Sequence, residues 1–326
     1  MMRAVVCEKL GAPGDLVLRD MPEPPDPSAG EIKVALAARG VQFVDVLMIA
    51  GEYQTKPPLP FIPGSEGAGE IVAVGEGVAN FSVGDLVMTR HSPGAFAEAA
   101  TIPANMALPV PKSMSLVQAA GFRSAYTTAY HALVQRGRLL EGEVLLVHGA
   151  SGGIGLAAVQ VGKVLGATVI ATGGSDEKLA VVTENGADHV INIKDGFRDR
   201  VKELTDGRGA DVIYDPIGAE VFDESMRCLN WGARILILGF VGGGPALAKT
   251  NHLLIKGASA VGVRVGGFNE FEPDTAAANL RVLVDWAEAG KITPHVSHTF
   301  PLDRVEDAMQ AIIDRKVVGK CILTNE

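Results

Sequence analysis

A glycine-rich turn is the part of the sequence whose spacing most clearly indicates chemistry. In EVLLVHGASGGIGLAAVQVGK an apolar run ends at Gly149, and Gly152, Gly153 and Gly155 follow as a helical pattern begins. Glycines let the main chain approach a phosphate closely, and the free N–H groups and the positive end of the next helix compensate its charge. Glycines can also serve packing alone, but the flanking strand and helix patterns favour a dinucleotide pyrophosphate site.

The end of the next apolar run indicates which dinucleotide would bind. A site for NAD usually places Asp or Glu there, about 20 residues after the turn, to bind the ribose 2′-hydroxyl. This run, ATVIATG, leads instead into Gly174 and Ser175. The missing carboxylate leaves room for a 2′-phosphate that Ser175 and Lys178 could hold. Asp176 and Glu177 fit the first turn of a helix, where acidic side chains are favourable.

Alternating strands and helices must position these residues. From residue 144 the apolar runs VLLVHG, ATVIATG, HVINI, DVIYDPIG and RILILGF alternate with helical patterns. Strands that are apolar on both faces and alternate with helices predict an α/β fold with a doubly wound parallel sheet. The first 120 residues instead show short strand-like runs separated by Gly, Pro and Asp, which predict a β-rich barrel or sandwich.

Length, charge and cysteine usage exclude several classes of protein. A chain of 326 residues predicts about two domains. A net charge of −9 disfavours nucleic acid or an anionic membrane as the main partner. Cys7, Cys228 and Cys321 are too far apart to suggest a disulfide framework or a thiolate metal site. With no export signal or spanning segment found, we expect a cytoplasmic protein with a small-molecule substrate.

The residues around the glycine turn resemble the zinc-independent quinone oxidoreductase and zeta-crystallin branch of the medium-chain dehydrogenase/reductases. The matching positions are Gly142, Glu143, Leu146, Ala150, Ser151, Gly152, Gly153, Gly155, Gln160 and Lys163. The resemblance extends over essentially the whole chain. It implies a GroES-like β-rich catalytic domain at 1–121, an NADPH-binding Rossmann domain at 122–266 and a return to the catalytic domain at 267–326. It also implies a homodimer formed through the edge strands of the Rossmann sheets.

The same resemblance implies a set of cofactor-binding positions. It places a phosphate-binding lysine at Lys178, whereas Ile193 stands where the family often has a tyrosine. The whole set is Thr127, Ala150, Ser151, Gly152, Gly153, Ile154, Gly155, Gly174, Ser175, Lys178, Gly239, Phe240, Arg315 and Lys320. The expected cofactor is therefore NADPH.

The zinc ligands of metal-dependent relatives have no counterpart in this sequence. Their positions fall on Gln42, on Ser65 and near Ala120, and residues 85–110 lack the cysteine cluster of a structural zinc site. Zinc needs thiolate, imidazole or carboxylate ligands. We therefore expect no metal and exclude zinc-dependent alcohol dehydrogenation.

Without a Lewis acid, an activated acceptor suits the site better than an alcohol. A quinone or an α,β-unsaturated carbonyl takes up hydride into a conjugated system, and its developing oxyanion needs hydrogen-bond donors. The resemblance places Tyr53 beside the nicotinamide, and Gln42 replaces the family's usual Asn with another amide. The alternatives are an enoyl-thioester reductase and a nucleotide-binding structural protein without turnover. Arg264 falls near the expected substrate mouth, where a surface salt bridge is the simpler role.

Overall fold

The computed structural model describes residues 1–326 as two compact units. The first unit comprises Met1–Ser124 and Thr293–Glu326, and the second comprises Ala125–Ile292. The second unit therefore extends beyond residue 266, where the sequence placed its end. Helices α9 (Val265–Phe271) and α10 (Pro273–Glu288) pack on each other in this unit. Asn279 of α10 and Gln135 exchange two amide hydrogen bonds of 3.0 and 3.1 Å, which join α10 to the rest of the unit.

The first unit is built on a seven-stranded sheet. Its order is β14-β15-β3-β4-β5-β7, and β6 also pairs with β3. A separate antiparallel pair is formed by β1 and β2. The strands are β1 (Met2–Val6), β2 (Val17–Met21), β3 (Glu31–Val41), β4 (Glu66–Val74), β5 (Leu86–Arg90), β6 (Ala99–Pro103), β7 (Ala107–Pro109), β14 (Val296–Pro301) and β15 (Lys320–Thr324). Because β15 pairs antiparallel with β3, the C-terminal segment completes this unit.

Short helices connect the strands of the first unit. They are α1 (Phe43–Ile49), α2 (Leu116–Ala119) and α11 (Val305–Ile313), with single turns η1 (Pro13–Asp15), η2 (Ala104–Met106) and η5 (Leu302–Arg304). Strand β3 alternates buried and half-buried residues along its first half, and Ile32, Val34 and Leu36 enter the core. This period of two is the pattern of a strand with one face on the core.

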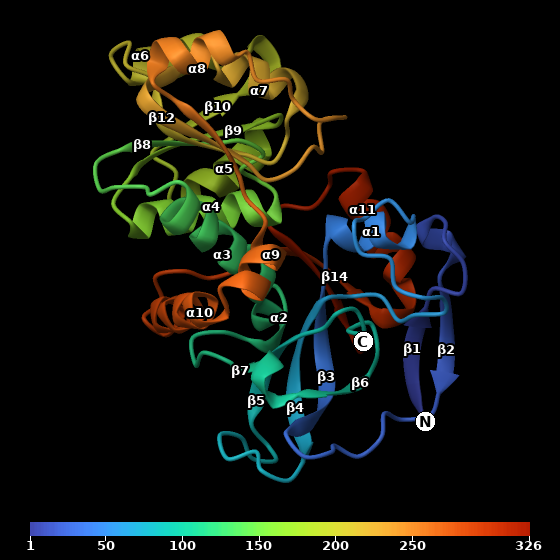
Figure 1. Ribbon diagram of the computed structural model, residues 1–326. Helices are drawn as coiled ribbons and strands as arrows, with labels where there is room; N and C mark the ends of the chain where they lie inside the picture. Colours follow the sequence, from blue (N-terminus) through green and yellow to red (C-terminus); the bar gives the residue numbers. More distant parts are fainter. The chain divides into compact units, whose positions relative to one another are not determined.

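The second unit is a parallel sheet between two layers of helices (Figure 1). Its strand order is β10-β9-β8-β11-β12-β13, and every pairing is parallel. The strands are β8 (Val144–Val147), β9 (Thr168–Gly173), β10 (His189–Asn192), β11 (Ala210–Asp215), β12 (Leu229–Ile237) and β13 (Ser259–Gly262). Strands β8 and β11 are buried throughout, as expected for central strands covered on both faces. The predicted α/β class is thus confirmed.

Helices α4 and α5 cover one face of this sheet, and α6, α7 and α8 cover the other (Figure 1). The helices not yet given are α3 (Arg123–Tyr130), the π-helical turn η3 (His131–Arg136), α4 (Gly153–Val164), α5 (Asp176–Glu184), η4 (Ile193–Asp195), α6 (Arg198–Leu204), α7 (Ala219–Ser225) and α8 (Thr250–Lys256). The strand order reverses beside β8, because β9 lies on one side of it and β11 on the other. Ligands of such sheets bind outside the carboxyl ends of the strands at this reversal. No helix of the chain is long and apolar enough to span a bilayer.

Candidate active site

The glycine turn follows β8 at the strand reversal, and its geometry leaves no space for larger residues. Gly149 has a φ of +57°, and Gly152 N–H donates to Gly149 O at 3.0 Å. A Cβ added at Gly155 would lie 2.3 Å from Gly149 O, well inside van der Waals contact. Ala150 N–H donates to Thr172 O at 3.1 Å, which ties the turn to β9. The predicted glycines therefore close a tight turn.

The first turn of α4 presents main-chain donors at this position. Gly152 is the N-cap, and the first helical bond runs from Leu156 N–H to Gly152 O at 2.8 Å. The N–H groups of Gly153, Ile154 and Gly155 precede that bond and have no partner within the helix. They carry the positive end of the helix dipole. Such a set of donors fits a pyrophosphate, so the residues present suit the expected dinucleotide.

A buried histidine fixes the end of β8 just before the turn. His148 is sealed in the core, where its ring nitrogens contact Thr172 Oγ and Ser225 Oγ, both at 2.8 Å. Burial lowers the pKa of His148 to about 3, so the ring is neutral. Because Ser225 donates its hydroxyl to Val221 O, it accepts from His148 Nε2–H. This arrangement joins β8, β9 and α7 beneath the glycine turn.

The end of β9 is open where a ribose 2′-phosphate was expected. Gly174 is exposed with no atom within 4 Å of a Cβ position, and Ser175 is the N-cap of α5. The nearest acidic side chain, Asp176, accepts a 2.8 Å hydrogen bond from Asn192 Nδ2 and is held by β10. Lys178 is half-buried on α5, and this burial lowers the pKa of its amine. The strand end thus offers a hydroxyl and an amine in place of a carboxylate.

The loops after β11 and β12 lie beside the glycine turn. A Cβ at Gly149 would contact Ile217 at 3.1 Å, and one at Gly218 would contact the Phe240 ring at 3.0 Å. Asp215 fixes the first loop by accepting from the N–H groups of Ile217 and Gly218 at 2.8 and 2.9 Å. The predicted Gly239 and Phe240 therefore lie in a loop at the same edge of the sheet as the turn, with Phe240 46% exposed.

A separate polar cluster occupies the first unit and includes Gln42 and Ser65, two of the positions where the resemblance places the zinc ligands of metal-dependent relatives. Gln42 Nε2 donates to Ser65 Oγ at 3.0 Å, and Ser124 Oγ donates to Gln42 Oε1 at 2.8 Å. Ser124 N–H donates to Glu66 Oε2 at 2.9 Å, and Lys320 Nζ donates to Glu66 Oε1 at 2.7 Å. We call these five residues the Gln42 network. Its amide and hydroxyl groups bind one another, and the chain holds no group of three His, Cys, Asp or Glu side chains suited to a metal.

Comparison with known proteins identifies the family. Residues 153–279 match the family model described as a zinc-binding dehydrogenase, and residues 28–112 match the alcohol dehydrogenase GroES-like domain. The chain is 37% identical to the quinone oxidoreductase-like protein 2 homolog of Nematostella vectensis, across 99% of this chain and 89% of the relative. The chain belongs to the quinone oxidoreductase branch of the medium-chain dehydrogenase/reductases. The resemblance inferred from the sequence is thereby confirmed.

Solved structures of this superfamily share the fold over the full length. Escherichia coli quinone oxidoreductase complexed with NADPH is 28% identical, with a TM-score of 0.89 over 99% of this chain and 100% of that one. The CurF ER cyclopropanase of the curacin A biosynthetic pathway is 27% identical, with a TM-score of 0.88 over 99% of each chain. The zinc-binding description of the family model contrasts with Gln42 and Ser65, which offer no thiolate or imidazole.

Glu66 and Lys320 have a structural role that the sequence did not reveal. Lys320 was predicted to bind the cofactor, and no role was predicted for Glu66. The two form a buried ion pair, with side chains 2% and 7% exposed respectively. The amine of Lys320 is thus engaged with Glu66 inside the first unit, and its contact with a cofactor stays a prediction. Arg315 is exposed just after α11, at a φ of +56°, and its cofactor role also stays a prediction. No sequence motif joins residues 66 and 320, so the pair was not foreseeable.

A buried carboxyl group lies beside the Gln42 network. Asp45 Oδ2 accepts from Gln42 N–H at 2.8 Å, while Asp45 Oδ1 has no hydrogen-bond partner. Burial raises the pKa of Asp45 to about 7, since charge is costly away from water. Asp45 therefore holds the main chain of Gln42 at the start of α1. The capping pattern Gln-x-x-Asp was its only sequence signal.

Tyr53 and Gln42 flank the same short helix. Gln42 is the N-cap of α1, and Tyr53 N–H donates to Leu47 O at 3.2 Å just beyond its end. Tyr53 is half-buried and packs against the core cluster that contains Phe61 and Met309. Its ring is thus anchored, which suits a positioned phenol better than a free loop side chain.

Gln160 gains a structural role that its place in the family pattern did not reveal. It accepts from Tyr126 Oη at 2.7 Å and donates to Asn185 Oδ1 at 2.7 Å. These bonds connect α3, which carries Thr127, to α4 and to the end of α5.

Arg264 lies in the short connection between β13 and α9. It is the N-cap residue of α9, and its side chain is exposed.

Proposed function

We propose that this protein is an NADPH-dependent, metal-independent reductase that transfers hydride to quinones or related conjugated carbonyls. The observation that carries the proposal is the glycine turn, with its main-chain donors and a carboxylate-free end of β9. The quinone oxidoreductase relatives support the acceptor class, and the NADPH complex of the Escherichia coli protein supports the cofactor. The Gln42 network supports metal independence, because Gln42 and Ser65 present an amide and a hydroxyl in place of thiolate or imidazole ligands.

One set of residues binds the cofactor, and another set stabilises the reduced acceptor. When bound, NADPH supplies the hydride. The N–H groups of Gly153, Ile154 and Gly155 hold the pyrophosphate, and Ser175 and Lys178 hold the 2′-phosphate. Thr127 borders the nicotinamide, and Gly239 and Phe240 line the cofactor, as the family resemblance implies. These contacts orient the reacting carbon, and orientation alone supplies a large part of catalysis.

Two side chains of the first unit stabilise the reduced acceptor. The Tyr53 phenol donates to the acceptor's carbonyl oxygen as negative charge develops there. Gln42 has a second amide N–H, because only one is used on Ser65, and this N–H is available as the other donor. Preorganised donors of this kind stabilise an oxyanion without a metal. The proton that completes the reduction comes from water.

Cofactor choice is tested with Lys178→Met. Loss of the amine removes the charge partner of the 2′-phosphate, so KM for NADPH rises about tenfold or more while KM for NADH stays close to wild type. Steady-state kinetics with both cofactors measure this. Equal effects on the two cofactors would show that Lys178 does not contact the 2′-phosphate.

Reaction class is tested with NADPH oxidation against a quinone, an enone, an enoyl-CoA and a simple aldehyde, each with a chelator control. We expect chelator-resistant turnover of the quinone or the enone. Turnover confined to enoyl-CoA would favour the enoyl-thioester reductase, and tight NADPH binding without any turnover would favour a structural role. Loss of activity with chelator would contradict metal independence.

We also propose a homodimer formed through the edge of the second unit's sheet. Strand β13 is an edge strand, and three of its four residues are exposed. Trp231 and Leu254 nearby are 74% and 81% exposed. An edge strand with exposed main-chain groups and exposed apolar side chains beside it favours pairing with a second chain. Val263 N–H donates to Ile237 O of β12, so the residues of β13 that alternate with it, among them Ala260, direct their main-chain groups away from the sheet. Ala260→Pro removes one of these outward donors, so light scattering is expected to show monomers.

A further inference from the structure

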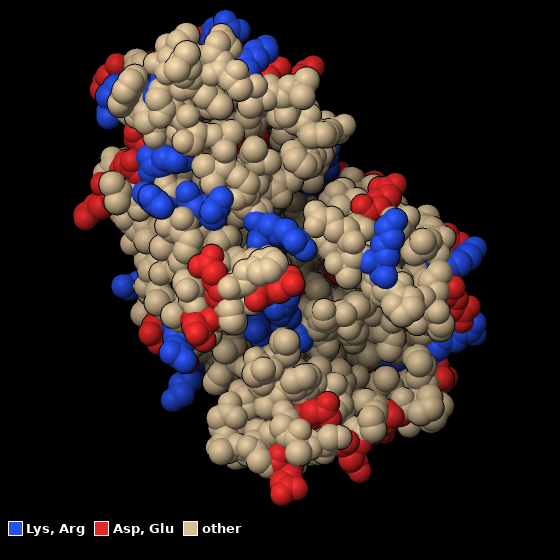
Figure 2. Space-filling view, in the orientation of Figure 1, with Lys and Arg blue, Asp and Glu red and all other residues tan.

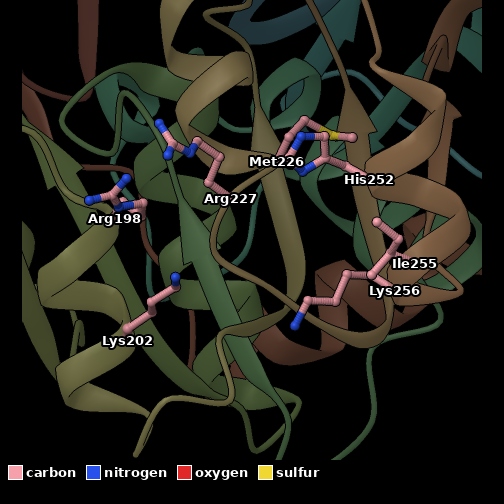
Figure 3. Close-up of a pocket in the computed structure, with 7 residues that line it drawn as sticks. All are labelled: Arg198, Lys202, Met226, Arg227, His252, Ile255 and Lys256. Atoms are coloured by element: carbon pink, nitrogen blue, oxygen red, sulfur yellow. The ribbon is translucent and has the colours of Figure 1, made fainter.

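A basic hollow lies on the face of the second unit opposite α4. Its wall consists of four cationic side chains, one histidine and two apolar side chains, and the hollow encloses about 200 Å³. The lining residues are Arg198, Lys202, Met226, Arg227, His252, Ile255 and Lys256 (Figure 3). None belongs to the expected cofactor set. The hollow lies among α6, α7 and α8, whereas the glycine turn leads into α4 on the other side of the sheet (Figure 1).

The arrangement of these charges costs stability unless an anion offsets it. Arg198 and Lys202 are one turn apart on α6, and like charges at this spacing repel each other. Lys256 lies on α8 and lines the same hollow. Lys202 and Lys256 enter the hollow from opposite sides, and Arg227 reaches it from the end of α7 (Figure 3). Figure 2 shows Lys and Arg side chains above α8 at the top of the view.

Acidic groups nearby neutralise only part of the positive charge of the hollow. Asp199 binds Arg198 through two 2.8 Å hydrogen bonds, which lower the pKa of Asp199, and the charges of Lys202 and Arg227 add to this lowering. Glu224 is committed to the N–H groups of Phe197 and Arg198 at 2.7 and 2.8 Å. Lys202, Arg227 and Lys256 form no ion pair. An excess of positive charge thus remains in a protein whose net charge is −9.

We propose that this hollow is a second ligand site that binds a phosphate or diphosphate group of a small molecule. Arginine forks and lysine amines are the usual partners of phosphate oxygens. A volume of about 200 Å³ admits a phosphate or diphosphate group and excludes a whole dinucleotide. Buried Met226 supplies the apolar floor of the hollow, and Ile255 lies at its exposed side.

The test uses inorganic pyrophosphate as the probe, with NADPH saturating so that the glycine turn is filled. Isothermal titration calorimetry at constant ionic strength compares wild type with Lys202→Met/Lys256→Met. We expect wild type to bind and the double variant to bind at least tenfold more weakly. Arg227→Gln serves as an independent single variant and is expected to weaken binding several-fold. Thermal unfolding of each variant establishes that it is folded.

A matched control removes the same charge elsewhere in the unit. Arg281→Met/Lys291→Met alters two exposed cations of α10 and the residues after it, and we expect pyrophosphate to bind as in wild type. Equal weakening in the two double variants would overturn the proposal, because it would reflect net charge alone. Absence of binding to wild type would also overturn it. In a parallel titration without NADPH, binding that is lost in Lys178→Met but kept in Lys202→Met/Lys256→Met, together with no binding when NADPH is saturating, would assign the anion to the cofactor site instead.

Discussion

The glycine turn recognises its ligand with main-chain groups, whereas the Gln42 network is made almost entirely of side chains. In the turn, N–H groups of consecutive residues lie at the start of α4, and the glycine at position 155 avoids a Cβ that would clash with Gly149 O. In the network, residues 42, 65, 66, 124 and 320 come from four separate stretches of the chain. The glycine turn depends on the absence of side-chain atoms, and the Gln42 network depends on hydrogen bonds between side chains.

This difference predicts different responses to substitution. A main-chain site is disrupted by added volume, even when polarity is unchanged. A side-chain network tolerates a change of volume better than the loss of one partner, since an unpaired buried polar group costs more than a pair contributes. The four predictions below test this contrast.

The largest effect is expected from Glu66→Gln, which leaves Lys320 buried without a carboxylate. Removing one partner of a buried ion pair costs about 3–5 kcal/mol. Urea unfolding measures the loss. Asp307→Asn breaks the exposed pair with Arg304 and is the matched control, with an expected cost below about 1 kcal/mol. Similar costs for the two variants would show that the buried pair contributes no more than a surface one.

Gly155→Ala tests the main-chain site. Its Cβ would lie 2.3 Å from Gly149 O, so the turn must open and the converging donors separate. We expect NADPH affinity to fall about a hundredfold, or roughly 2.7 kcal/mol, in fluorescence titrations. Gly266→Ala in α9 meets no atom within 4 Å and is the control. Unchanged affinity in Gly155→Ala would refute the assignment of the turn to pyrophosphate.

Asp45→Asn tests whether the buried carboxyl group beside the Gln42 network carries a pH-dependent cost in stability. Burial raises the pKa of Asp45 from 3.8 to about 7, so the folded state favours the protonated form. The stability that Asp45 contributes is complete below pH 4 and is lost as the pH rises through 7. The variant lacks this loss, so its Tm exceeds that of wild type by several degrees at pH 8 and by little at pH 4. Parallel Tm profiles across this range would contradict the prediction.

Ser65→Ala is expected to have the smallest effect on stability. It removes the acceptor of Gln42 Nε2 and costs about 1 kcal/mol. Because the amide is then held by Ser124 alone, its orientation is less restricted. We therefore expect kcat/KM for a quinone to fall several-fold, whereas NADPH affinity stays at the wild-type value. Ser65→Thr keeps the hydroxyl and restores most of the activity. A parallel fall in NADPH affinity would show that the two regions are not separable.

Local patterns were sufficient for the main-chain site and insufficient for the network. The turn could be predicted because its determinants lie within a few residues of Gly149, and the parallel sheet because apolar runs alternate with helical ones. Gln42 was predicted from the resemblance as a catalytic amide, and Ser65 was identified only as a position without a zinc ligand. Their mutual hydrogen bond, and the pairing of Glu66 with Lys320 across 254 residues, have no sequence pattern.

By itself the sequence determined the fold class, the glycine turn and the absence of a carboxylate at the end of β9. Each of these features depends on residues close together in the sequence, through their side-chain volume, their hydrophobic periodicity and their capping of helices. The tertiary structure alone decided that Lys320 pairs with Glu66, that Asp45 is sealed beneath Gln42 and that four cations share one hollow. Long-range contacts and burial depend on how distant segments pack, and the spacing of residues along the chain does not encode that packing.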